Sequence, residues 1–326
     1  VGADDFGLAD PSGGWDFNSL RPSKFRPSGY GRFEWTVDEE DYVKQYMPPS
    51  IVDMAFHAEQ LVSEMDYAGV DMALLHRTPY LGIGNNFIAE CCYKFPDRLQ
   101  GLAHVEEWSI RSDIDGAVNK IQDAIVNKRL HGLQFLPDHL SLYGQEEDWD
   151  GPDFRPYWDA VHELRIPVFI TPSYAALAST SGSSADAIVD QLGMISAWMN
   201  TYPDMKVILT HGLSWRTFVH DDRLDIPDKV FEAIPSENPN FFLQILFAIF
   251  LGGLWEYPML EVRSTMEKLV DRVGIDKLIW GTDMPMVMRF YTYQQNVNHI
   301  KRCSDFLDHK EIDMILGGNM AKLMKL

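Results

Sequence analysis

The stretch Lys206–Gly212 reads KVILTHG and is a short apolar run that ends in a histidine and a glycine. Three consecutive aliphatic residues bounded by polar ones are typical of a buried strand. A helical pattern precedes the run, because apolar residues recur at spacings of three and four between Ile188 and Met199. The stretch therefore predicts a buried strand that follows an amphipathic helix, with His211 at the carboxyl end of the strand.

The same pattern recurs along the chain. Each recurrence is an apolar run of strand length, and stretches with helical periodicity, such as Ile114–Ile125, separate the runs. Repeated alternation of strand and helix predicts a parallel sheet with helical crossovers. The other predicted strands are Asp71–His76, Leu99–Glu106, Leu130–Pro137, Pro167–Thr171, Phe241–Phe247 and Lys277–Asp283.

Seven strands are one short of the eight that close a TIM barrel. We therefore expect an α/β fold, a distorted TIM (β/α)8 barrel, whose first strand lies upstream of Val1 or within the irregular opening of the chain. A doubly wound open sheet is the alternative. No glycine-rich dinucleotide or phosphate fingerprint follows any of the runs, so the barrel is favoured.

The opening of the chain differs from the rest. Residues 1–50 are rich in Gly, Pro, Ser and aromatic residues and show no sustained period of two or 3.6. We expect them to form an irregular excursion or lid of the same domain. Helical periodicity begins after Pro49 and ends at Gly69, so residues 51–326 are expected to form the barrel domain.

Composition excludes several classes of protein. The 326 residues are 46% hydrophobic, which is enough for a large core, and 48 acidic against 28 basic residues give a net charge of −20. Such a charge repels a phosphate backbone, so no nucleic-acid partner is expected. The longest apolar run, Phe241–Tyr257, is shorter than a membrane span. Three cysteines, no signal peptide and no membrane segment favour a cytoplasmic protein.

Polar residues follow several of the predicted strands, where the active sites of parallel barrels lie. His211 and Asp283 each come directly after an apolar run, and both side-chain types suit acid/base work or metal ligation. We expect these two residues to be catalytic. The candidates for substrate binding are His76, Arg77, Glu106, Gln134, Thr171 and Arg289, of which the two arginines suit a carboxylate.

At these strand ends the chain resembles the amidohydrolase superfamily, in the branch that contains aminocarboxymuconate semialdehyde decarboxylase and resorcylate-type decarboxylases. The order and spacing of seven blocks carry the resemblance. They are Met65–Asp71, Tyr93–Arg98, His131–Gln134, Tyr157–Ile170, Tyr202–Gly212, Trp280–Pro285 and Gly317–Leu323.

The resemblance implies a distorted barrel with one divalent metal, zinc or manganese, held by a His-x-His on the first strand, a His on the fifth and an Asp on the eighth. Asp283 matches the metal-binding Asp, and His211 matches the sixth-strand His that acts as acid/base. The sequence has no His-x-His, and Thr171 occupies the fifth-strand position. Catalytic zinc typically has three protein ligands, so an altered metal site and a metal-free pocket are both expected possibilities.

The leading hypothesis for function is non-oxidative decarboxylation of a small cyclic or aromatic-derived carboxylic acid. The alternatives are hydrolysis of a lactone, ester or activated C–C bond with water activated by His211 and Asp283, and a non-catalytic binding barrel. The aromatic residues of the opening and of the loop Met286–Tyr291 suit either a flat substrate or a second subunit, and we expect a homodimer.

Overall fold

The computed structural model describes residues 26–37, 39–77, 84–172 and 184–325. Its main sheet has seven parallel strands in the order β12-β11-β8-β7-β6-β5-β4. All seven predicted strands are confirmed, each shorter than its apolar run. They are β4 (Ala73–Leu75), β5 (Leu99–Ala103), β6 (Gly132–Phe135), β7 (Val168–Ile170), β8 (Val207–Leu209), β11 (Phe241–Ile245) and β12 (Leu278–Trp280).

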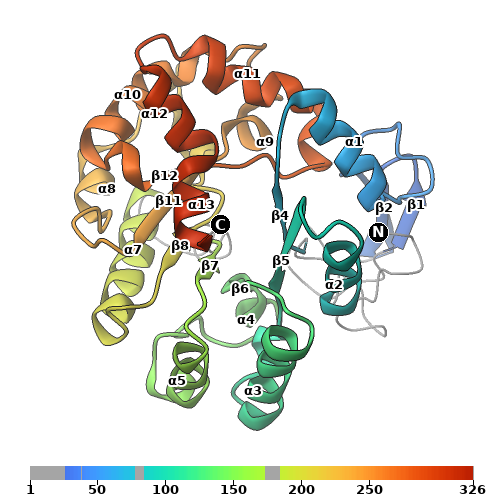
Figure 1. Ribbon diagram of the computed structural model, residues 1–326, viewed down its shortest axis with the longest axis vertical. Coiled ribbons are helices and arrows are strands. Elements are labelled where there is room, and N and C mark those ends of the chain that lie inside the picture. The colour runs from blue at the N-terminus through green and yellow to red at the C-terminus, as the bar shows by residue number, and fades with distance from the viewer. Residues whose placement is uncertain (1–25, 38, 78–83, 173–183, 326) are drawn as a thin grey trace.

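The strands curl into a partly open barrel with the helices on its outside (Figure 1). Within the described residues the ring is not closed, because β4 and β12 each pair with one neighbour only. The helices are α1 (Ala58–Ala68), α2 (Asn85–Lys94), α3 (Ile114–Gln122), α4 (Asp138–Leu142), α5 (Arg155–Glu163), α7 (Ser184–Thr201), α8 (Asp228–Ala233), α9 (Phe247–Leu251), α10 (Arg263–Arg272), α11 (Tyr293–Cys303), α12 (His309–Asp313) and α13 (Asn319–Met324).

Alternating side chains of the strands build two cores, because successive residues of a strand point to opposite faces of the sheet. Leu102, Phe169, Ile208 and Ile279 form an inner cluster, with Leu323 of α13 packed onto it. The larger outer core lies between the sheet and the helices. Strands buried on both faces explain why their sequences read as continuous apolar runs rather than as alternating ones.

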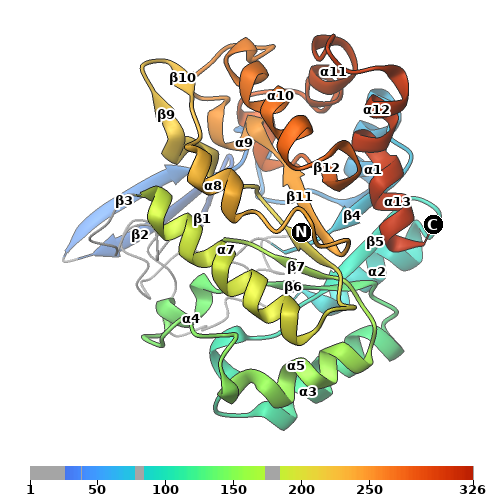
Figure 2. The same ribbon diagram turned by 90° about the vertical axis from the view of Figure 1, so that its left-hand side faces the viewer.

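The segment before the barrel is more regular than its sequence predicts. β1 (Arg26–Gly29), β2 (Arg32–Val37) and β3 (Glu40–Gln45) form a three-stranded antiparallel sheet. This sheet projects from the body of the molecule (Figure 2). Contrary to the prediction, the segment is therefore not irregular over these three strands; its role as a lid stays a prediction, and residues 1–25 lie outside the described residues.

A tight turn explains how this sheet forms. Gly29, Tyr30 and Gly31 all have positive φ, which glycine adopts at little cost, and Phe33 is buried behind the turn.

Two further observations concern the helices. The first begins at Ala58 rather than after Pro49, and no helix in the described part of the chain is long and apolar enough to cross a membrane.

Candidate active site

His211 and Asp283 lie side by side beyond the carboxyl ends of β8 and β12. His211 Nε2 is 3.9 Å from Asp283 Oδ2, as the sequence predicts from strand order. Both residues have a left-handed backbone, with φ of 60° and 57°. Non-glycine residues adopt this conformation at a cost and often do so at functional sites. Both side chains thus meet just beyond the ends of their strands.

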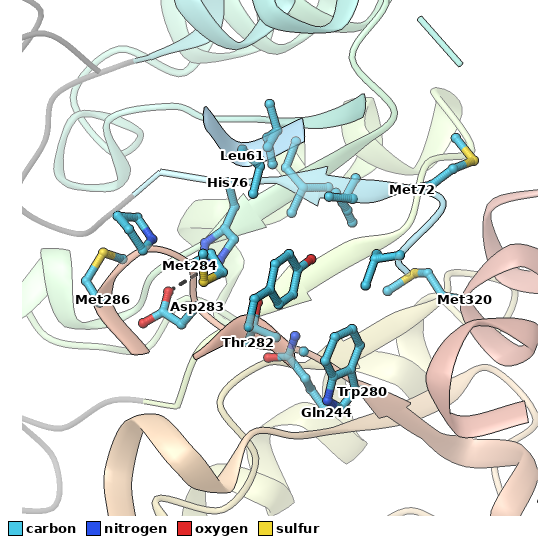
Figure 3. Close-up of a pocket in the computed structure, with 18 of the residues that line it drawn as sticks. Leu61, Met72, His76, Gln244, Trp280, Thr282, Asp283, Met284, Met286 and Met320 are labelled. Carbon is cyan, nitrogen blue, oxygen red and sulfur yellow. Dashed lines mark ion pairs between the residues drawn. The ribbon is translucent and has the colours of Figure 1, made fainter. Parts of the chain in front are cut away.

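His76 completes a group of three at this end of the barrel. Its Nε2 is 3.8 Å from Asp283 Oδ1, so the two imidazoles approach opposite oxygens of one carboxylate (Figure 3 shows the His76 contact). The two rings are 6.2 Å apart, centroid to centroid, and meet edge to face. His211 Nδ1 is buried and has no hydrogen-bond partner among the described residues. Its proton is therefore best placed on Nε2, facing Asp283.

Electrostatics favour a charged Asp283 carboxylate beside a neutral His76 ring. Burial raises the pKa of Asp283, but the hydrogen bond and charge of His211, together with His76, outweigh it and lower that pKa overall. Burial also lowers the pKa of His76 below its ordinary value, although Asp283 opposes the shift. Asp283 is therefore ionised near neutral pH, and His76 is neutral there.

A cavity of about 720 Å³ opens beside this group and runs between β4 and β12, where the ring is not closed. His76 and Asp283 line one end of it, and His211 sits directly behind Asp283. The rest of the wall is mainly apolar, and Figure 3 shows some of these side chains. They include Leu61, Met72, Trp280, Met284, Met286 and Met320. An apolar wall with a few polar groups at one end is typical of a small-molecule site.

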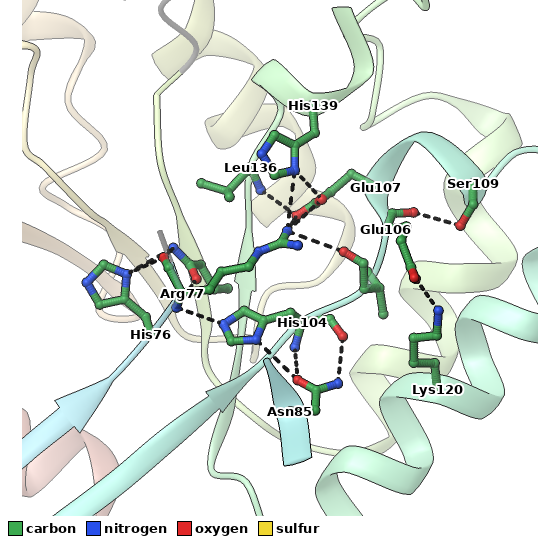
Figure 4. Close-up of polar contacts among 12 residues, drawn as sticks. His76, Arg77, Asn85, His104, Glu106, Glu107, Ser109, Lys120, Leu136 and His139 are labelled. Carbon is green, nitrogen blue, oxygen red and sulfur yellow. Dashed lines mark hydrogen bonds and ion pairs between the residues drawn. The ribbon is translucent and has the colours of Figure 1, made fainter. Parts of the chain in front are cut away.

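Arg77 lines the cavity and is bound to a buried partner, so its role as a substrate clamp stays a prediction. Its Nη2 donates to Glu107 Oε1 and Oε2 at 2.6 and 2.7 Å, and His139 Nδ1 lies 2.8 Å from Glu107 Oε2 (Figure 4). All three side chains are buried. Burial raises the pKa of Glu107, but the charges of Arg77 and His139 outweigh it and lower that pKa. The guanidinium thus balances a buried carboxylate of the protein itself.

Three of the expected binding residues lie outside the wall of this cavity as the described residues form it. Glu106 forms an ion pair with Lys120 of α3. The Thr171 hydroxyl is 2.7 Å from Thr210 Oγ1. Arg289 donates to the carbonyl oxygens of Met286 and Gln45, so it fastens β3 to the loop after β12. In each case a nearby protein group takes up the polar atoms that were expected to meet substrate.

Gln134 lines the cavity as expected, and a buried network extends behind it. The Gln134 amide contacts His76 and the backbone of Arg77, while His104 Nε2 accepts from Arg77 N. Asn85 in turn holds His104 through three hydrogen bonds (Figure 4). The network residues that sequence reasoning did not select are Glu107, His139, His104 and Asn85. The sequence feature that could have indicated this network is the cluster of titratable residues from His104 to Glu107, directly after β5.

The side chains at the strand ends differ from the ligand set of the metal that the resemblance implies. Asp283 offers a carboxylate, but the hydroxyl of Thr171 stands at the fifth-strand position and bonds Thr210. Across the described ranges, no group of three or more His, Cys, Asp or Glu is arranged to hold a metal ion. Catalytic zinc uses three protein ligands. The described residues therefore do not make up a metal site by themselves.

Known proteins resemble this chain over most of its length. The gamma-resorcylate decarboxylase of Rhodococcus jostii is 22% identical over 275 residues, which cover 74% of this chain and 75% of that protein. A probable 2-pyrone-4,6-dicarboxylic acid hydrolase from Acinetobacter baumannii, 17% identical, superposes with a TM-score of 0.59 over 89% of this chain and 94% of its own.

A third relative was solved with a metal. The dihydroxybenzoic acid decarboxylase of Polaromonas, with bound manganese and 2-nitroresorcinol, is 18% identical and has a TM-score of 0.58 over 85% of this chain and 88% of its own. These structures share the fold. The profile of the Amidohydrolase family matches residues 32–326. With that match and the His211–Asp283 pair at the strand ends, the chain belongs to the amidohydrolase family of enzymes.

Proposed function

We propose that this enzyme is a non-oxidative decarboxylase of a small aromatic carboxylic acid of the hydroxybenzoate type. The observation that carries the proposal is the meeting of His76, His211 and Asp283 at one end of an apolar cavity. A flat ring suits the apolar wall, and the N–H of His76 at the polar end can donate to a carboxylate. The gamma-resorcylate decarboxylases among the relatives support the same class of substrate.

The three side chains can divide the chemistry as follows. His211 is the proton source, and its proton passes through the Asp283 carboxyl group, which lines the cavity, to the ring carbon that bears the carboxylate. The bond between that carbon and the carboxylate then breaks, its electron pair restores the aromatic ring, and carbon dioxide leaves. Asp283, ionised at neutral pH, stabilises the positive charge on His211 while it carries the proton.

His76 takes the role that was expected for Arg77, which is to bind the substrate carboxylate. Its side chain is 29% exposed, it lines the cavity, and its Nε2 points toward Asp283. A neutral imidazole that is protonated at Nε2 can donate a hydrogen bond to the substrate carboxylate or to a phenolic oxygen beside it. Binding would then rest on one hydrogen bond and the apolar wall rather than on an arginine.

The test is to incubate the purified protein with 2,6-dihydroxybenzoate and related hydroxybenzoates, with and without added manganese, and to measure carbon dioxide release. Manganese is included because the Polaromonas relative was solved with it. His211→Asn should lower kcat by about 10²- to 10⁴-fold, since it removes the proton donor. The control is His220→Asn, which changes an exposed histidine of β9 (Val219–His220) and should leave kcat unchanged.

Hydrolysis is the second candidate, because a probable 2-pyrone-4,6-dicarboxylic acid hydrolase has a similar fold. The two reactions differ in the fate of water. Decarboxylation releases carbon dioxide and puts a solvent proton on the ring, whereas hydrolysis puts a solvent oxygen into the product. Turnover in ¹⁸O-labelled water that labels the product, without release of carbon dioxide, would refute decarboxylation.

A further inference from the structure

Gln134 of β6 is buried and touches both His76 and the peptide group of Arg77. Its Oε1 is 3.1 Å from Arg77 N, and its Nε2 is 3.2 Å from Arg77 O. A backbone N–H can only donate and a carbonyl oxygen can only accept. The amide therefore has one allowed orientation, because a flip would set donor against donor and acceptor against acceptor.

This orientation decides which nitrogen of His76 carries the proton. The second N–H of Gln134 Nε2 faces His76 Nδ1 at 3.0 Å. A proton on Nδ1 would oppose that donor, although Arg77 O, 3.1 Å away, could otherwise accept it. Nδ1 must therefore offer its lone pair to Gln134, and the proton of the neutral ring belongs on Nε2.

The residues behind Gln134 support the same arrangement. His104 Nε2 also accepts from Arg77 N at 3.1 Å, so the proton of His104 belongs on Nδ1, which is 3.2 Å from Asn85 Oδ1. Asn85 Oδ1 additionally accepts from His104 N at 2.9 Å, and Asn85 Nδ2 donates to His104 O at 2.9 Å. Every donor in this hydrogen-bond network faces an acceptor, and Gln134 and His104 hold the peptide group of Arg77 from two sides.

We propose that Gln134 is a positioning residue that holds His76 as the tautomer protonated at Nε2, so that His76 presents an N–H donor to Asp283 and the cavity. In this tautomer Nε2 has no lone pair with which to ligate a metal or accept a proton. His76 is then a hydrogen-bond donor to the substrate carboxylate. That last consequence rests on the proposed function, whereas the tautomer does not.

The experiment reads the tautomer directly, without substrate. Long-range ¹H–¹⁵N correlation spectra of the ¹⁵N-labelled protein at pH 8 distinguish protonated from unprotonated ring nitrogens, and a His76→Asn spectrum identifies the signals of His76 among the ten histidines. The wild-type protein should show an unprotonated Nδ1 and a protonated Nε2. A protonated Nδ1 on His76 in the wild-type protein would overturn the proposal without any need for a Gln134 variant.

Gln134→Met removes both amide donors at nearly the same volume. The nearest remaining partner of Nδ1 is then Arg77 O, so His76 should change to the tautomer protonated at Nδ1. The matched control is Gln244→Met, which alters another glutamine of the cavity wall whose Oε1 accepts from His211 N and which should leave His76 protonated at Nε2. An unchanged tautomer in a folded Gln134→Met protein would show that Gln134 does not set it.

Activity supplies a separate readout. If the enzyme decarboxylates a hydroxybenzoate, Gln134→Met should lower kcat/KM by about ten- to hundredfold, the usual effect of losing a group that orients a site histidine. A wild-type protein that shows the expected tautomer but releases no carbon dioxide would refute the proposed function and leave the role of Gln134 intact. The two proposals can therefore fail independently.

Discussion

Glu106 and Glu107 are neighbours in the chain with the same side chain and opposite surroundings. Glu106 meets Lys120 at the surface of α3, and its side chain is 25% exposed, whereas the Glu107 side chain is fully buried against Arg77. Ion pairs at a surface contribute little, because water and salt screen them. A buried pair is different, because removal of one partner leaves an uncompensated charge without water.

Glu107→Gln should therefore destabilise the protein strongly. The variant leaves the Arg77 guanidinium buried without a counter-charge, and we expect the free energy of unfolding to fall by about 3 to 5 kcal/mol. Urea denaturation followed by circular dichroism measures this change. Glu59→Gln, which breaks the exposed pair with Lys94, should leave the free energy of unfolding almost unchanged. Equal effects of the two substitutions would contradict the structural importance of the buried pair.

His299 should make stability depend on pH. Burial lowers the pKa of His299 to about 4, against about 6.5 in an unfolded chain. Above pH 6.5 both states are neutral at this residue, whereas between 6.5 and 4 the unfolded chain binds a proton that the folded protein does not. The free energy of unfolding should therefore fall as the pH drops through this window.

The measurement is a series of urea denaturation curves between pH 7 and pH 4. The ring of His299 on α11 packs edge to face against Phe247, so His299→Phe keeps an aromatic ring at this place. The variant should lose less stability over the window than the wild-type protein. A loss of the same size in both proteins would show that other groups cause it.

At the scale of elements, the turns at the carboxyl ends of the strands position the candidate catalytic residues. The turn after β8 brings His211 to Asp283, and it does so with positive φ at His211 and Gly212. At Gly212 a Cβ atom would lie 2.0 Å from the ring of the buried Trp215. The turn therefore needs glycine both for its backbone and for the space beside Trp215.

Gly212→Ala should lower the free energy of unfolding by at least about 1 kcal/mol, because it combines a strained φ with a steric clash. It should also lower activity by displacing His211. Gly193→Ala is the matched control, because Gly193 lies within α7 and a Cβ there meets nothing within 4 Å. That variant should gain about 0.5 to 1 kcal/mol from helix propensity. Thermal unfolding of both variants measures the difference.

At the scale of the molecule, the sheet β1–β3 stands next to the cavity that holds the candidate site. Phe33, Tyr46 and Met47 of this region line the cavity together with His76 and Asp283. Arg289 joins β3 to the loop after β12 through Gln45. Exposed apolar side chains, among them Val43 on β3 and Phe290 beside Arg289, lie on these two joined segments.

We expect these segments to contribute to a homodimer interface, because apolar side chains exposed together are a common feature of contact surfaces. Sedimentation equilibrium should give a mass of twice 37.3 kDa for the protein. The double variant Val43→Glu and Phe290→Glu should sediment as a monomer, since both changes place a charge in the contact. A wild-type monomer would refute the prediction, and a dimer in the double variant would place the interface elsewhere.

Hydrophobic patterning is local, and this is why the order of strands and helices, the parallel sheet and the pairing of His211 with Asp283 could all be predicted from the sequence. Side chains beyond the end of a strand no longer alternate between the two faces of the sheet. The side-chain directions of Arg77, Glu106 and Glu107 therefore depended on partners distant in the sequence. Only the tertiary structure brought Glu107 and His139 to Arg77 and fastened Arg289 to Gln45. A buried charge needs a counter-charge nearby, and the fold determines which residue supplies it. The residues next to it in the sequence do not indicate that partner.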